Sequence, residues 1–159
     1  MVEQAEPTLT RHVSSVPTSC TQIESTVLNA SMNTIWPKFR DFKFVEIAPE
    51  KVKAAEFTSG VAGQVGATVK LTYTDGATWE IRITEISEKY HRLGFELIIA
   101  EPAAFATSIQ TELEFYSVTS DDHTFVRWTT EFSNDADASV IQDQKYKKQE
   151  FFSAVKANL

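Results

Sequence analysis

The residues best suited to chemistry are Gln144 and Lys148, which lie four positions apart between Val140 and Asn158, a segment without Gly or Pro. A segment of this kind predicts a helix, and residues four apart share one helix face. At 100° per residue the same face carries apolar side chains: Ile141, Phe151, Phe152, Val155 and Leu159. Since a buried ammonium without a partner is costly, Lys148 either extends along the helix edge to solvent or meets a carboxylate or a polar ligand.

Glu80 and Arg82 form the second candidate pair, because side chains two residues apart on a strand share one face. Such a pair could provide acid–base chemistry or hold an anion. The opposite face carries Trp79, Ile81 and Ile83, so the competing interpretation is a solvated ion pair. Lys148, Glu80 and Arg82 therefore remain weak catalytic candidates, and the catalytic residues stay unknown.

The sequence predicts no metal site and no cofactor. It has one cysteine, Cys20, and three histidines that are far apart: His12, His91 and His123. The triplet Gly60, Gly63 and Gly66 lacks a following Lys-Ser/Thr and precedes a predicted strand rather than a helix. We therefore expect these glycines to form a turn before the sheet and not a phosphate-binding loop.

Composition narrows the classes of partner. Among 159 residues, 15 Lys and Arg stand against 22 Asp and Glu, for a net charge of −7, which disfavours nucleic acid. No apolar run approaches the roughly 18 residues of a membrane-spanning helix, so we expect no stable membrane insertion. Residues 1–19 lack the apolar core of a signal peptide and predict a flexible tail before a single domain over 20–159. We expect a cytoplasmic protein that is a monomer or a weak dimer.

Alternating apolar residues predict the elements that position these side chains. Residues 21–28 form a first strand, and a short helix follows, with Ser31 or, preferably, Thr34 as its N-cap, which places Pro37 in the first turn. Residues 45–57 are mixed and could hold a second short helix. From Val69 to Phe132 the period is two, with a hairpin at Asp75-Gly76, so five successive strands form an antiparallel meander. The fold class is α+β.

The order of these elements resembles the helix-grip fold of the Bet v 1/START-like (SRPBCC) superfamily, including its polyketide cyclase/dehydrase-like branch. The resemblance is carried by residues 34–42 (TIWPKFRDF), the glycine-bearing residues 60–70, Asp75-Gly76 with residues 79–83, and residues 90–95. It implies a curved antiparallel sheet of about six or seven strands around a long C-terminal helix, with one or two short helices after the first strand. An internal cavity would lie between sheet and helix.

The resemblance also implies a small hydrophobic partner, because members bind lipids, sterols, plant hormones or polyketides. The loops 73–78 and 100–106 would form the mouth. The predicted ligand-binding residues are Val69, Leu71, Tyr73, Trp79, Ile81, Phe95, Leu97, Ile109, Thr111, Leu113, Trp128, Thr130, Gln144, Lys148 and Phe152. The gate and latch loops of the hormone receptors are absent, and a shift of one residue would place Glu80 rather than Ile81 in the cavity.

Two functions follow, with a third in view. The first is binding of a hydrophobic or amphipathic ligand, because apolar walls with a few neutral polar groups are typical of ligand sites. The second is a cyclase, dehydratase or isomerase, for which Lys148 would be the acid or base and Tyr73 a proton donor. An interaction domain similar to the Hsp90-activator relatives is the third. On fold, the alternative is a cone-shaped α+β domain like the nuclear-transport-factor group.

Overall fold

The computed structural model describes residues 19–159. The predicted tail, residues 1–19, therefore lies outside the described residues except for Ser19. Strands and helices follow one another in the order β1 (Thr21–Leu28), α1 (Met32–Arg40), α2 (Phe44–Ile47), β2 (Val52–Ser59), β3 (Thr68–Tyr73), β4 (Thr78–Ser87), β5 (Arg92–Glu101), β6 (Ile109–Val118), β7 (His123–Phe132) and α3 (Ala138–Ala157).

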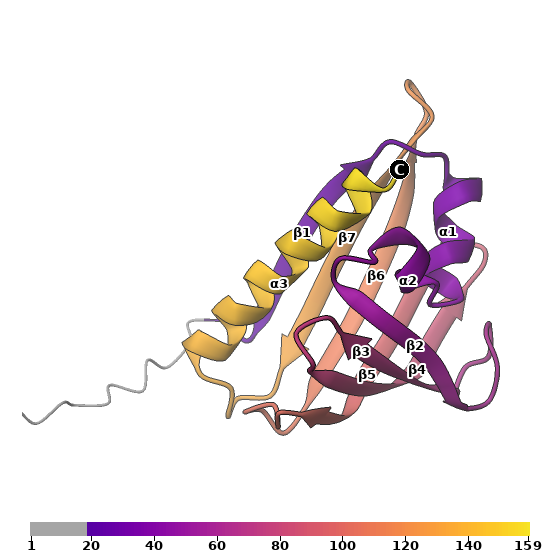
Figure 1. Cartoon of the computed structure of the whole chain (residues 1–159). Coiled ribbons are helices and arrows are strands. Elements are labelled where there is room, and N and C mark those ends of the chain that lie inside the picture. Colours follow the sequence, from indigo (N-terminus) through magenta and orange to yellow (C-terminus); the bar gives the residue numbers. More distant parts are fainter. Residues whose placement is uncertain (1–18) are drawn as a thin grey trace, which may run out of the picture.

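The seven strands form one antiparallel sheet in the order β1-β7-β6-β5-β4-β3-β2. The strands from β2 to β7 are neighbours in sequence and in space, as expected for a meander, and β1 pairs with β7 to extend the sheet. The sheet curves, and α3 runs along β1 and β7 across its inner face, while α1 and α2 close the other end (Figure 1). The predicted helix-grip fold and the long C-terminal helix are confirmed.

One local prediction was wrong. The N-cap of α1 is Ser31 and not Thr34, so Pro37 lies inside the helix. The proline is tolerated because Asn33, whose carbonyl would accept its missing N–H, is exposed to solvent. The segment that the sequence left mixed, residues 45–57, contains most of the second short helix, α2, and then the beginning of strand β2, which the sequence did not predict. Only Val52 of this edge strand is buried, so pairing with β3, rather than an apolar pattern, determines its conformation.

The end of the molecule away from the α3 N-terminus is filled by aromatic side chains. Phe39 of α1 packs edge-to-face on Phe44 of α2 and on Phe115 of β6, at ring-centroid distances of 5.6 and 5.0 Å. Phe151 of α3 packs on Phe44 at 5.4 Å and on Trp128 of β7 at 5.6 Å. These geometries are favourable for aromatic pairs. They join both short helices, the sheet and α3 into one core.

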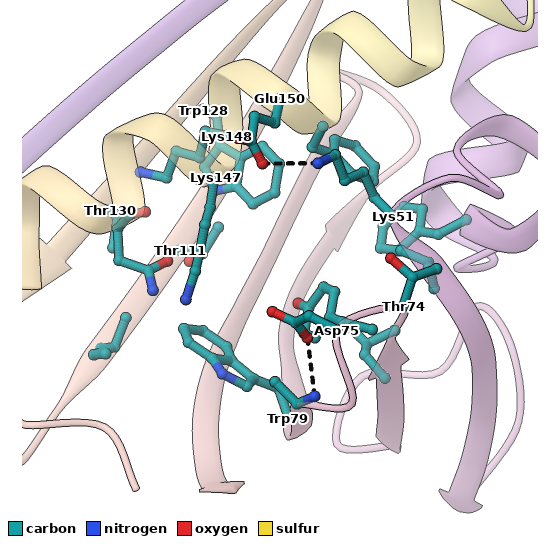
Figure 2. Close-up of a pocket in the computed structure, with 18 of the residues that line it drawn as sticks. Lys51, Thr74, Asp75, Trp79, Thr111, Trp128, Thr130, Lys147, Lys148 and Glu150 are labelled. Atoms are coloured by element: carbon teal, nitrogen blue, oxygen red, sulfur yellow. Dashed lines mark hydrogen bonds and ion pairs between the residues drawn. The ribbon is translucent and has the colours of Figure 1, made fainter. Parts of the chain in front are cut away.

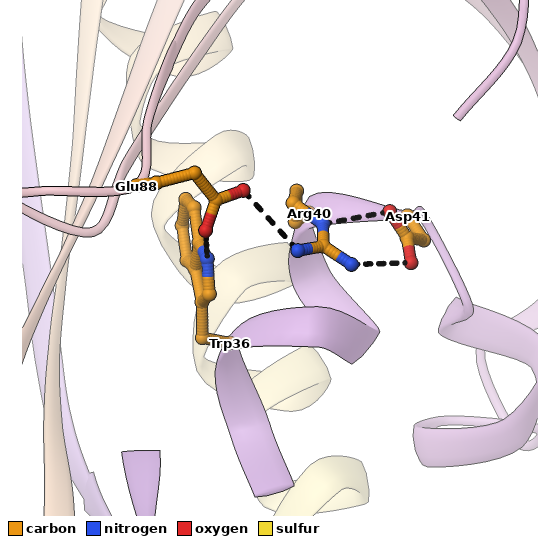
Figure 3. Close-up of polar contacts among 4 residues, drawn as sticks. All are labelled: Trp36, Arg40, Asp41 and Glu88. Atoms are coloured by element: carbon orange, nitrogen blue, oxygen red, sulfur yellow. Dashed lines mark hydrogen bonds and ion pairs between the residues drawn. The ribbon is translucent and has the colours of Figure 1, made fainter. Parts of the chain in front are cut away.

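A polar cluster fixes α1 to the turn between β4 and β5 (Figure 3). The indole N–H of Trp36 donates a hydrogen bond of 2.8 Å to Glu88 Oε2, and Arg40 Nη1 donates to Glu88 Oε1 at 3.1 Å. Arg40 also bonds both carboxylate oxygens of Asp41, at 2.9 and 3.0 Å. The Trp36 hydrogen bond is the largest cause of the lowered pKa of Glu88. The segment Arg40-Asp41-Phe42, at the C-terminal end of α1, is thus held in place by charge-assisted hydrogen bonds.

The hairpin between β3 and β4 forms as Asp75-Gly76 predicts. Gly76 has a φ of 91°, in the region that favours glycine, and its N–H donates to the Tyr73 carbonyl at 3.0 Å. Asp75 Oδ1 accepts from the Ala77 N–H at 2.9 Å. The hairpin thereby holds Tyr73 and the start of β4 at the inner face of the sheet.

The glycines 60, 63 and 66 all have φ between 74° and 89° and lie in the loop that leads into β3. No helix follows them, so the loop offers no helix N-terminus to a phosphate. Within residues 19–159, no helix combines the length and the apolar character that crossing a bilayer requires.

Candidate functional site

A cavity of about 270 Å³ lies between the inner face of the sheet and α3. Strands β3 to β7 supply its floor, α3 its roof, and the β3–β4 hairpin and the α2–β2 turn its sides (Figure 2). Such a volume lies near the lower end of the roughly 300–1,000 Å³ typical of ligand pockets. The fold therefore encloses space that its own side chains leave unfilled.

Most of the predicted ligand-binding residues line this cavity: Leu71, Tyr73, Trp79, Phe95, Ile109, Thr111, Trp128, Thr130, Gln144 and Lys148. The others do not line it. Val69, Ile81 and Leu113 are at most 1% exposed and, with Leu97 and Phe152, pack in the core around it. Strand alternation places a residue on the inner face but does not say whether neighbouring side chains already cover it. A role for any of these residues in binding remains a prediction.

Lys148 lies inside the protein, so the solvent-reaching alternative is wrong. The residue is only 3% exposed, and its Nζ donates to Gln22 Oε1 on β1 and lies 5.7 Å from the centroid of the Trp128 ring. In Figure 2 the side chain extends from α3 toward Thr130. Burial lowers the pKa of Lys148 from 10.5 to about 7, against the opposing effect of Glu24. This ammonium can therefore lose its proton near neutral pH.

Two residues that line the cavity each have a polar atom, Trp128 Nε1 and Thr130 Oγ1, that is buried without a hydrogen-bond partner in the part of the chain that the structure describes. Thr130 is only 2% exposed, and both residues belong to β7. A buried donor or acceptor left unpaired costs about 1–3 kcal/mol, so natural proteins satisfy most of them. Both exceptions belong to residues that line the cavity.

Charged side chains frame one side of the cavity. Lys51 from the α2–β2 turn pairs with Glu150 of α3 at 2.8 Å, and Asp75 of the hairpin lies opposite them (Figure 2). Lys147 also lines the cavity and pairs with Asp143 at 2.9 Å. Burial raises the pKa of the Tyr73 hydroxyl, which therefore stays neutral at physiological pH.

The prediction that residues 100–106 form a second loop at the mouth of the cavity was wrong. None of its residues lines the cavity, whereas Thr74, Asp75 and Ala77 of the first predicted loop do. Ala104 and Ala106 instead pack against Ile109 and Phe132 in a separate small cluster. Two register shifts interrupt the pairing of β4 with β5, and such irregularities carry little sequence signal.

Glu80 and Arg82 also lie outside the cavity, on the outer face of β4. Ile81 is fully buried and lies on the inner face. Of the two alternatives, Ile81 rather than Glu80 therefore faces the interior. The predicted Glu80–Arg82 pair is absent among the described residues: Arg82 pairs with Glu96 of β5, and Glu80 accepts a hydrogen bond of 2.9 Å from Thr58. Cross-strand neighbours are closer than residues two apart on one strand. This placement removes the geometric basis for a catalytic role of either residue in the cavity.

Sequence reasoning missed the residues that other elements bring to the site. Phe44, Lys51 and Val52 come from α2, the following turn and β2, and α3 adds Lys147, Glu150 and Phe151 beside the predicted Gln144 and Lys148. Gln22 and Glu24, which surround the Lys148 ammonium, were also missed. Their signal was present, because alternation from the buried Leu28 back along β1 places both on the inner face.

Solved structures share this architecture. A protein from Nitrosospira multiformis is 21% identical, with a TM-score of 0.75 over 86% of this chain and 94% of its own. Ginseng major latex-like protein 151 from Panax ginseng is 16% identical, with a TM-score of 0.71 over 86% and 95%. The protein XoxI from Bacillus cereus is 16% identical, with a TM-score of 0.72 over 87% and 94%. No protein-family model and no curated protein matches the chain. The chain has the Bet v 1-like helix-grip fold.

Proposed function

We propose that this protein binds a small hydrophobic or amphipathic molecule in the cavity between the sheet and α3. The observation that carries the proposal is the open space itself, lined by Leu71, Trp79, Phe95 and other apolar side chains while the surrounding core is closely packed. Protein interiors rarely leave voids larger than a water molecule, because unfilled space forfeits packing energy. A ligand that fills the cavity restores this energy.

The aromatic walls favour a ligand with a flat or flexible apolar body. Tyr73 and Trp79 meet edge-to-face at 6.5 Å at one end of the cavity, and Trp128 and Phe151 meet in the same way, at 5.6 Å, beside α3. Aromatic side chains bury large areas in such contacts. A lipid, sterol or polyketide fragment small enough for the cavity fits this lining, as the helix-grip resemblance implies.

Tryptophan fluorescence tests the proposal, because two of the three tryptophans line the cavity and Trp36 does not. We expect the neutral probe N-phenylnaphthylamine to quench the protein saturably at one molecule per chain. Trp36→Phe should keep the quenching, whereas the double variant Trp79→Phe with Trp128→Phe should lose most of it. Quenching that follows Trp36 instead, or none with any hydrophobic probe, contradicts the proposal.

A cyclase, dehydratase or isomerase acting on such a ligand is the second candidate, and Lys148 is the observation that favours it. An amine whose pKa is about 7 can both accept and donate a proton at neutral pH, and this one lies in the cavity wall. Mass spectrometry of a bound ligand after incubation tests this function. Conversion by the wild type that Lys148→Met abolishes supports it, and a ligand recovered unchanged from both proteins counts against it.

A further inference from the structure

Hydrogen-bond donors gather on one wall of the cavity. Trp128 Nε1 and Thr130 Oγ1 lack partners within residues 19–159, and Lys148 Nζ bonds only Gln22 Oε1 there. An indole nitrogen and an ammonium can only donate, and a threonine hydroxyl can donate as well as accept. The residues of this wall thus carry several donors, and no carboxylate of residues 19–159 is in direct contact with them.

The register of the sheet explains why these groups meet. Trp128 and Thr130 are two residues apart on β7 and so point to the same, inner face. Thr111 of β6 is the cross-strand partner of Thr130, and Gln22 of β1 is its partner on the other side. Lys148 reaches this row from α3 above it (Figure 2). The arrangement is built by three adjacent strands and one helix rather than by a mobile loop.

The positive charge of Lys148 has no carboxylate partner in the described part of the chain within ion-pair distance. Glu24, the acidic group that raises the pKa of Lys148, accepts hydrogen bonds from the side-chain amides of Gln22 and Gln149, at 2.9 and 3.3 Å. Of the acidic residues that line the cavity, Glu150 is paired with Lys51, and Asp75 belongs to the β3–β4 hairpin. A buried ammonium with only one neutral protein acceptor is poorly compensated, and a ligand anion would compensate it.

We infer that the ligand is an amphipathic carboxylic acid, whose carboxylate lies against Lys148, Thr130 and Trp128 and whose apolar body extends toward Tyr73, Trp79 and Phe95. This inference rests on the proposed binding function. A carboxylate accepts up to about four hydrogen bonds and donates none, which matches a wall of donors. An alcohol or amide head group would leave the ammonium without a counter-charge.

The inference has a consequence in pH. In the protein without ligand, burial lowers the pKa of Lys148 to about 7. A bound carboxylate should raise this pKa, because an opposite charge favours the protonated amine. Affinity for the acid should therefore be level below pH 7 and fall above it, by up to tenfold per pH unit. The other charged groups that face this region are Glu24 of β1, Asp75 of the hairpin, Lys51 of the α2–β2 turn, and Lys147 and Glu150 of α3. Variants of Lys148 separate its contribution from theirs.

Calorimetric titration with octanoate and octan-1-ol, which share one chain length, tests the inference. We expect octanoate to bind at least tenfold more tightly at pH 6 than at pH 9, and octanol to bind equally at both. Lys148→Met should lower the affinity for octanoate by about tenfold or more at pH 6 and should make that affinity independent of pH. Thr130→Val replaces the threonine by a side chain of nearly the same shape that lacks the hydroxyl. This variant should bind octanoate more weakly and octanol as well as the wild type does. Lys156→Met, in the exposed last turn of α3, is the matched control and should change neither.

The possible results distinguish the proposed binding function from the inference that the ligand is a carboxylic acid. Octanol binding without a preference for octanoate, or octanoate binding without pH dependence, overturns the carboxylate inference and leaves the binding function intact. Absence of binding by octanoate, octanol and N-phenylnaphthylamine overturns the binding function itself. Circular dichroism of each variant excludes loss of the fold as the cause.

Discussion

Replacing Lys148 with methionine should stabilise the protein at pH 6 and destabilise it slightly at pH 10.5. Burial lowers the pKa of this amine from 10.5 to about 7. At pH 6 the group is charged in the folded and unfolded states alike, and at about 1.4 kcal/mol per pKa unit its burial costs at most about 5 kcal/mol. Methionine removes this cost but also loses the hydrogen bond to Gln22, worth about 1.5–3 kcal/mol. The expected net gain at pH 6 is about 2–3 kcal/mol.

The sign of the pH dependence follows from proton binding. Between pH 7 and 10.5 the unfolded chain holds the proton that folded Lys148 has released, so the stability of the wild type rises with pH across this window. The advantage of Lys148→Met should shrink over the same range. Near pH 10.5 only the lost hydrogen bond remains, and the wild type should be more stable by about 1 kcal/mol.

Urea unfolding followed by far-ultraviolet circular dichroism at pH 6, 8 and 10 measures both effects. Lys156→Met, at an exposed lysine on the same helix, is the control and should give a stability difference that does not vary with pH. A Lys148→Met protein that is less stable than the wild type by the same amount at every pH would refute the reasoning, because it would mean that the buried ammonium carries no net desolvation cost.

Three further predictions concern the contacts that hold the site in place. Asp137→Ala should lower the free energy of unfolding in urea by about 1 kcal/mol, because the Asp137 side chain caps α3 by accepting a hydrogen bond from the Val140 N–H. Ser31→Ala should lower it much less, because the Ser31 side chain makes no cap hydrogen bond to α1, and equal losses would contradict this account. Glu88→Ala should lower the free energy of unfolding by about 1–2 kcal/mol because the Trp36 indole loses its acceptor, and Trp36→Phe should make the effect of Glu88→Ala much smaller in a double-mutant cycle. Hydrogen bonds from Ser133 and Thr107 lower the pKa of Asp135 to about 2, so a carboxyl NMR titration should find Asp135 ionised at pH 3 and protonated only as the pH falls through about 2, and Thr107→Val should shift this titration upward.

Strong periodic signals made most of the fold predictable. Alternation from Val69 to Phe132, the Asp75-Gly76 turn and the uninterrupted C-terminal segment identified the meander, its hairpin and α3. Strand β2 was missed because its conformation depends on pairing with β3, and the α1 N-cap was missed because the sequence does not show that the helix tolerates Pro37 in its interior.

The sequence predicted which face of the sheet carries the site, but not which residues of that face line the cavity. Sequence alternation identified which residues turn inward but could not distinguish Leu71, at the cavity, from Val69, packed in the core two residues earlier. The fate of Lys148 stayed open for the same reason. Its burial depends on Gln22, which is 126 positions away in the chain, and no local pattern reports such a contact.

Native mass spectrometry of the purified protein tests most directly whether the cavity is a binding site. We expect the wild type to carry, or to take up from a panel of carboxylic acids, one small molecule per chain. Thr111→Phe, which fills the cavity, should lose that added mass, whereas Gln110→Phe, exposed on the outer face of the same strand, should keep it. Bare wild-type protein under every condition, or an adduct that persists in Thr111→Phe, would contradict the account.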